Sequence, residues 1–210
     1  MRRRFADIAG TTVMLGGFVL AAVVTVALVL PSAGQPALGA GWRATSTGPL
    51  GPADIDFLIK VRQAGLWEIP TGQQAQTSAQ SEKVKDVGRH LVEDHTKLDI
   101  EVRKVAAQLG VDLPSAASPD QQRWMAQLSS KTGASYDRDF ANLLRAAHGK
   151  VFTVVAAVRA GTRNDEIRKF AQKAVVVVMR HMTLLESTGL VDHFALPEPP
   201  TPSPLPGGIK

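Results

Sequence analysis

The sequence predicts an all-α protein: four long helices packed as a bundle behind an apolar N-terminal segment. Three observations support this fold class. Apolar residues make up 44% of the 210 residues and aromatic residues only 5%. Such a mixture favours helix-on-helix packing over aromatic-rich β-sheets. Four long stretches repeat apolar residues at three- and four-residue steps, which is the spacing of one helix face. Turn and capping residues separate these stretches.

The N-terminal segment, residues 1–30, predicts a membrane anchor or a signal segment. Its first four residues carry three arginines, and residues 8–30 contain no charged residue. A helix needs about 20 residues to cross the hydrocarbon core of a membrane. Because basic residues stay in the cytoplasm, we expect a single-pass protein whose C-terminal domain lies outside the cell membrane. The alternative is a secreted protein, cleaved near Gly39 or Ala40.

Residues 31–52 are rich in Gly, Pro, Ser and Thr and predict a flexible linker. The bundle domain is expected over residues 53–192. Its first helix covers about residues 54–78, with a kink expected at Pro70, which cannot donate a backbone hydrogen bond. Its apolar stripe also carries one acidic residue and two glycines: Leu58, Val61, Gly65, Glu68, Gly72 and Ala75.

The second helix is predicted over about residues 81–109, with Ser81 as its N-cap and Gly110 ending it. The sequence Ser118-Pro119-Asp120-Gln121 is a capping box and opens a short helix that reaches about residue 130. The third and fourth long helices cover about residues 135–160 and 164–187. The stripes of these three long helices each include a histidine, at positions 95, 148 and 181.

The order of these helices predicts the connectivity. The short links near Gln80 and Gly161 indicate two antiparallel helical hairpins. Residues 110–134 are long enough to cross the length of the bundle and contain only the short helix. Two hairpins joined by one long crossover is the ferritin-like connectivity. Residues 193–210 form a proline-rich tail, which we expect to be extended.

Composition excludes several functions. The net charge of +5 comes from interspersed charges of both signs, so no nucleic-acid-binding surface is expected. The chain has no cysteine, which excludes disulfides, thiolate metal sites and a thiol nucleophile. It also lacks the glycine-rich motifs of nucleotide-binding proteins.

Each long helix places one candidate metal ligand on its apolar stripe: Glu68, His95, His148 and His181. Ionisable groups are costly to bury without partners, and imidazole is a common metal ligand inside helical bundles. Counting residues from the hairpin turns places His181 about 9 Å along the axis from His148. Two alternatives therefore stay open: a site of all four residues, or a site of Glu68, His95 and His148 without His181. Asp94 or Asp99 is a candidate to orient a histidine. The alternative reading is that these histidines are hydrogen-bonded core residues.

A di-iron centre is not expected. Di-iron carboxylate bundles use Glu-x-x-His on two helices. The residues three positions before the striped histidines are Val92, Arg145 and Val178, and no Glu-x-x-His occurs in the chain.

Several segments resemble one bacterial family. They are Ala64-Gly65-Leu66-Trp67-Glu68, Leu91-Val92-Glu93-Asp94-His95-Thr96, Tyr136-Asp137-Arg138-Asp139-Phe140, Ala147-His148 and His181-Met182. Together they resemble the family called domain of unknown function 4142, assigned to the ferritin-like superfamily, and residues 162–164 and 188–192 resemble an actinobacterial branch. The resemblance implies a four-helix bundle and export but no established activity. Pro70, directly after Glu68-Ile69, departs from the family pattern.

The sequence leaves three functions open, and it identifies no catalytic residue. The first is a non-enzymatic envelope module for interaction or stress, tethered to the membrane by its N-terminal helix and contacting an envelope protein or a second copy of itself. The second is a protein that binds a transition-metal ion through the inward-facing Glu and His residues. The third is a metal-dependent redox enzyme.

Overall fold

The computed structural model describes residues 38–199. The predicted anchor over residues 1–30 and most of the predicted tail lie outside the described residues. Within residues 38–199 no helix combines the length and the apolar character needed to cross a membrane. This part of the chain is helical, and its only β-type pairing is one isolated antiparallel bridge between Arg43 and Leu50.

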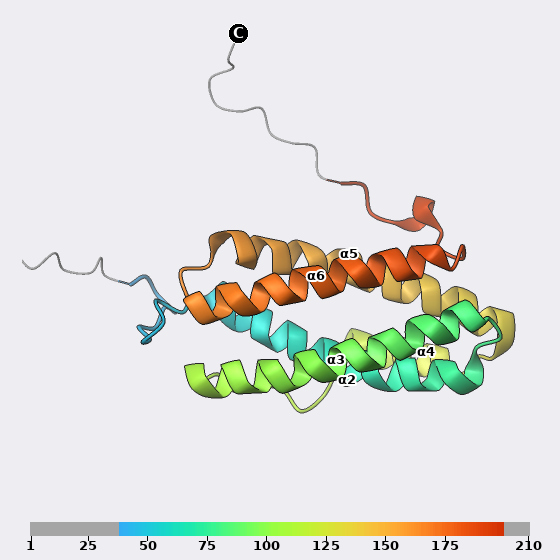
Figure 1. Ribbon diagram of the computed structural model, residues 1–210, viewed down its shortest axis with the longest axis horizontal. Helices are drawn as coiled ribbons and strands as arrows, with labels where there is room; N and C mark the ends of the chain where they lie inside the picture. Colours follow the sequence, from blue (N-terminus) through green and yellow to red (C-terminus); the bar gives the residue numbers. More distant parts are fainter. Residues whose placement is uncertain (1–37, 200–210) are drawn as a thin grey trace, which may run out of the picture. The chain divides into compact units, whose positions relative to one another are not determined.

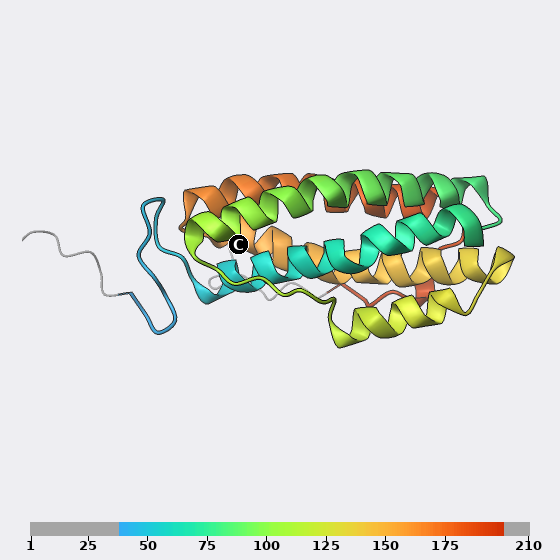
Figure 2. The same cartoon turned by 90° about the horizontal axis from the view of Figure 1, so that it is seen from below.

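Two antiparallel hairpins form the bundle (Figure 1), with a short helix in the crossover that joins them. The helices are α2 (Pro52–Ser78), α3 (Glu82–Leu109), α4 (Pro119–Ser129), α5 (Gly133–Gly161) and α6 (Asp165–Ser187), followed by the 3₁₀ helix η1 (His193–Ala195). Helix α3 packs on α6, and α2 packs on α5. Figure 2 shows α4 lying along the outside of α2 and α5, both of which it contacts.

The predicted helix ends agree with the structure to within about two residues, the usual uncertainty of helix assignment. Gly110 ends α3 in the left-handed conformation, with φ of 63°. The capping box of α4 is formed: the Gln121 amide donates to Ser118 Oγ, and the Ser118 amide donates to Gln121 Oε1. Helix α2 continues on both sides of Pro70 as one helix.

Two glycines let α2 and α3 approach closely. A Cβ atom added to Gly72 would lie only 2.5 Å from the carbonyl oxygen of Gly88. A Cβ on Gly88 would lie 2.8 Å from the carbonyl oxygen of Gly72. Because real Cβ atoms essentially never come within 3.0 Å of other heavy atoms, this crossing requires glycine on both helices.

The bundle core consists of two apolar clusters with a polar layer between them. One cluster contains Leu98 of α3 and Val155 of α5, whereas the other contains Leu91 of α3 and Leu144 of α5. Between these pairs along each helix lie His95 and His148, which are both buried. Glu68 and His181 occupy the corresponding positions in α2 and α6. The polar layer therefore lies within the length of the bundle, with apolar packing on both sides.

Residues 43–51, which are expected to belong to a flexible linker, are instead folded against one end of the bundle. Arg43 and Leu50 exchange backbone hydrogen bonds of 2.9 and 2.8 Å, and Leu50 is fully buried. The side-chain amide of Asn164, the N-cap of α6, donates to Thr45 Oγ1 and to the Gly48 carbonyl. This segment is ordered because its turn satisfies the polar groups of a helix N-terminus.

Candidate metal centre

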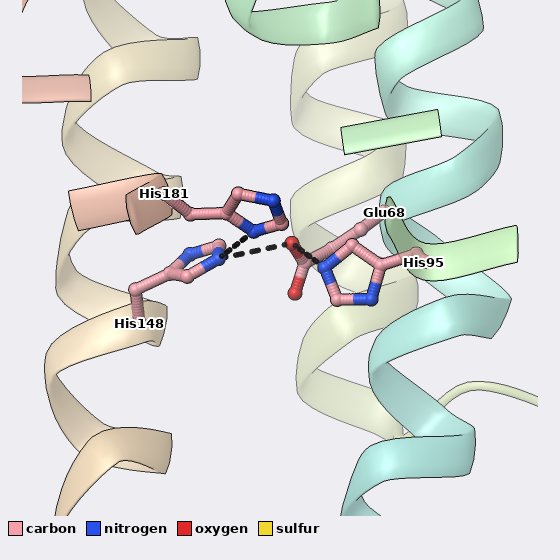
Figure 3. A group of neighbouring side chains, drawn as sticks. All are labelled: Glu68, His95, His148 and His181. Atoms are coloured by element: carbon pink, nitrogen blue, oxygen red, sulfur yellow. Dashed lines mark hydrogen bonds and ion pairs between the residues drawn. The ribbon is translucent and has the colours of Figure 1, made fainter. Parts of the chain in front are cut away.

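The structure brings together all four of the candidate ligands (Figure 3): Glu68, His95, His148 and His181. They come from α2, α3, α5 and α6, one from each long helix. One donor atom of each residue lies within 4.8 Å of the donor atoms of the other three. None of the four side chains belongs to a residue that is more than 3% exposed.

Of the two alternatives that the sequence leaves open, the structure shows the group that includes His181. His181 Nδ1 is 3.1 Å from His148 Nε2. Helix α6 begins only at Asp165, so His181 lies 16 residues after the start of α6, and His148 lies 13 residues before the end of α5. The remaining offset of three residues is about 4.5 Å along the axis, which two imidazole side chains can span.

The hydrogen-bond partners of His148 and His181 fix which ring nitrogen carries the hydrogen. His148 Nδ1 is 2.8 Å from the Leu144 carbonyl oxygen, which can only accept, so Nδ1 carries the hydrogen. His181 Nε2 is 3.0 Å from Asp94 Oδ2 and likewise donates. In the neutral rings His148 Nε2 and His181 Nδ1 therefore both present lone pairs. These two nitrogens face each other, although neither has a hydrogen to share.

Glu68 and His95 complete the group, and they contact each other without using all of their hydrogen-bonding capacity. Glu68 Oε2 lies 2.8 Å from His95 Nε2 and 3.3 Å from His148 Nε2. The 2.8 Å contact is at ion-pair distance but is not aligned as a hydrogen bond, and His95 Nδ1 has no hydrogen-bond partner. Leaving a buried polar atom unsatisfied costs about 1–3 kcal/mol. The donor set thus has the composition and the unmet bonding capacity of a cation site.

Burial and mutual charge set the ionisation of these side chains. Burial lowers the pKa of His148 and outweighs the attraction of the Glu68 carboxylate. Burial also lowers the pKa of His181, to about 3, with further lowering by His95 and His148. Burial alone would raise the pKa of Glu68. The carboxylate is attracted by the His148 and His95 imidazoles when they are protonated, and this attraction outweighs burial and lowers the pKa of Glu68 to about 2. Neutral imidazoles and an ionised carboxylate are the forms that bind metals.

Asp94 orients His181 from outside the group. Its carboxylate, only 6% exposed, also accepts an ion pair from Arg180 at 3.0 Å. Arg180 donates in turn to His90 Nδ1 at 2.7 Å. The hydrogen bond between His181 and Asp94 confirms one of the two residues that were predicted to orient a histidine. The other candidate, Asp99, instead pairs with Arg62 and Arg103.

Two groups that contact the candidate ligands or their partners were not predicted from the sequence. The Leu144 carbonyl, which fixes the ring of His148, gives no sequence signal beyond its place one helical turn before the histidine. Arg180 reaches Asp94 across the α3–α6 interface. Its position directly before His181 was the one available hint.

Comparisons with known proteins agree with this fold. The sequence model of the family described as "Domain of unknown function (DUF4142)" matches residues 42–187. The crystal structure of a DUF305 fragment from Deinococcus radiodurans is similar, with a TM-score of 0.58 and 14% identity, covering 65% of this chain and 95% of that chain. The protein CopM in its Cu(II)-bound form is also similar, with a TM-score of 0.55 and 13% identity, covering 64% and 94%. No curated protein matches the sequence.

Proposed function

The chain belongs to the DUF4142 family, and from the chemistry of its buried centre we propose that it binds one transition-metal ion through Glu68, His95, His148 and His181. One observation carries the proposal: His148 Nε2 and His181 Nδ1 lie 3.1 Å apart. The contacts of the other ring nitrogens with the Leu144 carbonyl and Asp94 leave both of these nitrogens without a hydrogen in the neutral rings. Two lone pairs in this position repel each other unless a proton or a metal ion lies between them. The adjoining Glu68 carboxylate and His95 imidazole also have unused hydrogen-bonding capacity, which favours an ion shared by all four.

The ligand atoms limit which metal ions suit the site. Three imidazole nitrogens and one carboxylate oxygen suit Zn²⁺ or Cu²⁺, whereas Ca²⁺ and Mg²⁺ prefer sites made of oxygen ligands. CopM, which shares the fold, is described in a Cu(II)-bound form, so copper belongs in the first experiment beside zinc. CopM is only 13% identical to this chain, so the similarity is used only to choose which metal ions to test.

The number of protein ligands favours binding over catalysis. Four side chains can fill a tetrahedral coordination shell, as in structural zinc sites, whereas catalytic zinc sites keep one position for water or substrate. We therefore propose a metal-binding protein, and we rank a metal-dependent redox enzyme below it. If no metal binds, the hypothesis of a non-enzymatic envelope module for interaction or stress is favoured instead.

We also propose that the bundle is ferritin-like and lies outside the cell membrane. The two hairpins and their long crossover support the first part. The second part rests on the sequence alone, namely the uncharged residues 8–30 behind three arginines. A protease added to intact cells would then degrade the bundle domain, whereas a domain inside the cell would be protected.

The metal proposal is tested by metal analysis of the full chain purified in detergent without chelator, loaded with Zn²⁺ or Cu²⁺ and freed of excess ion. We expect one ion per chain in the wild type and little in His148→Ala. The matched control is His193→Ala, because His193 is exposed in η1, away from the four ligands. Less than about 0.1 ion per chain in the wild type, or equal losses in both variants, would refute the proposal.

A further inference from the structure

A pocket with a volume of about 430 Å³ opens between α2, α4 and α5 and reaches Glu68. Glu68 contributes to the pocket wall and also to the metal centre, whereas none of the three histidines lines the pocket. The two contacts between Glu68 and the imidazoles that Figure 3 marks both end at the same carboxylate oxygen, Oε2. Glu68 therefore separates the candidate metal centre from a pocket large enough for a small organic molecule.

The inner wall of this pocket is aromatic and apolar. Trp67 of α2 and Trp124 of α4 both line it, with ring centroids 5.4 Å apart and planes inclined by 60°. The aliphatic side chains that line it are those of Ala64, Ala147, Val151 and Val154. Trp67 is only 1% exposed and packs against Trp124, so the partly exposed ring of Trp124 and the aliphatic side chains form the surface open to a ligand.

The charged groups of the wall are unbalanced. Lys60 and Lys150 contribute positive charge, and Glu68 is the one acidic residue among the lining residues. Lys60 pairs with Asp56, but Lys150 has no carboxylate within ion-pair distance in the described part of the chain. Of the uncharged polar lining residues, Ser118 and Gln121 bond each other's backbone in the α4 capping box. Lys150 thus remains available to a negative group.

We propose that this pocket binds a small organic anion, a carboxylate with a flat apolar body. The body contacts Trp124, which packs over the buried Trp67, and the aliphatic wall, and the carboxylate lies near Lys150. A second part of the inference rests on the proposed metal function. A divalent ion would add two positive charges directly behind Glu68, which otherwise repels an anion. Loading the centre then strengthens anion binding, and the anion strengthens metal binding by the same factor.

The test uses benzoate as the probe, titrated by calorimetry into the full chain in detergent, in metal-free and zinc-loaded forms. We expect one benzoate per chain, bound about tenfold more tightly by the loaded form, because the ion would add two positive charges behind Glu68, which is buried and borders both the centre and the pocket. Lys150→Gln should weaken benzoate binding by at least threefold. Lys169→Gln is the control, because Lys169 is an exposed lysine paired with Glu166 on α6 and does not line the pocket.

The outcomes separate the two proposals. Zinc at one ion per chain without benzoate binding overturns the pocket inference and leaves the metal function standing. Equal benzoate affinity with and without zinc overturns the coupling. If no zinc binds, the metal function fails, and the metal-free titration decides the pocket alone: binding that weakens in Lys150→Gln supports it, and binding unchanged in that variant overturns it. Benzamide, the uncharged analogue, should bind more weakly than benzoate to the loaded wild type.

Discussion

Replacing Asp94 by asparagine tests whether the centre depends on the orientation of His181. Asp94 accepts the hydrogen of His181 Nε2 at 3.0 Å, which leaves Nδ1 unprotonated toward the other ligands. An asparagine offers an amide hydrogen as well as an oxygen, so it no longer fixes this tautomer. The substitution also removes the negative charge that makes the His181 imidazole a stronger electron-pair donor to a metal ion. Loss of such a partner typically weakens metal binding by about 10–100-fold.

This range corresponds to about 1.4–2.7 kcal/mol of binding free energy. The assay is a zinc competition titration against a chromophoric chelator, and we expect one site per chain in the variant, with only the affinity reduced. Folding should be little affected, because Arg180 is 45% exposed and keeps contact with water and His90. Glu93→Gln is the matched control. It removes the same charge from the preceding residue of α3, and Glu93 pairs with Lys97 instead of a residue of the centre. Wild-type affinity in Asp94→Asn, or an equal loss in Glu93→Gln, would refute the reasoning.

Two further predictions concern stability. The metal-free protein should lose stability as the pH falls from about 6.5 to 3, because the unfolded chain binds protons that buried His148 and His181 resist, with a slope of up to about 2.7 kcal/mol per pH unit for two such groups. Urea unfolding at several pH values measures this slope. Gly72→Ala should destabilise the protein by about 1–3 kcal/mol, because the new Cβ would meet the Gly88 carbonyl at 2.5 Å. Its control is Gly161→Ala, where a Cβ would meet nothing within 4 Å.

Each of these two predictions can fail clearly. Stability that stays constant between pH 6.5 and 4 would mean that the histidines titrate equally in the folded and unfolded chains. The sign follows from the lowered pKa values: stability is fully present above the pKa of the unfolded imidazole and falls below it. For the glycine pair, equal unfolding midpoints in Gly72→Ala and Gly161→Ala would show that α2 and α3 can separate at no cost.

The helices and the four candidate ligands could be predicted because both depend on a local pattern. A period of 3.6 residues assigns each side chain to a face, and Glu68, His95 and His148 occur in step with apolar neighbours. The level of His181 along the axis could not be predicted from the same pattern. It depends on where α6 begins after the turn: the count from the turn near Gly161 includes residues 162–164, which precede the start of α6 at Asp165.

The remaining features depend on contacts between distant segments. Asp94 lies 87 residues from His181, and only the packing of α3 on α6 brings them together. The turn around Gly48 has the composition of a flexible linker, and its order depends on Asn164, 116 residues away. Trp124 lies on the short helix α4, and only the packing of α4 on α2 places it beside Trp67 in a pocket wall.

X-ray absorption spectroscopy at the metal edge of the zinc-loaded full chain tests most directly whether the four side chains share one ion. The predicted spectrum has four nitrogen or oxygen neighbours at about 2.0–2.1 Å, with the outer-shell scattering of three imidazoles. Six oxygen neighbours, or scattering from one imidazole or none, would contradict a shared centre of Glu68, His95, His148 and His181.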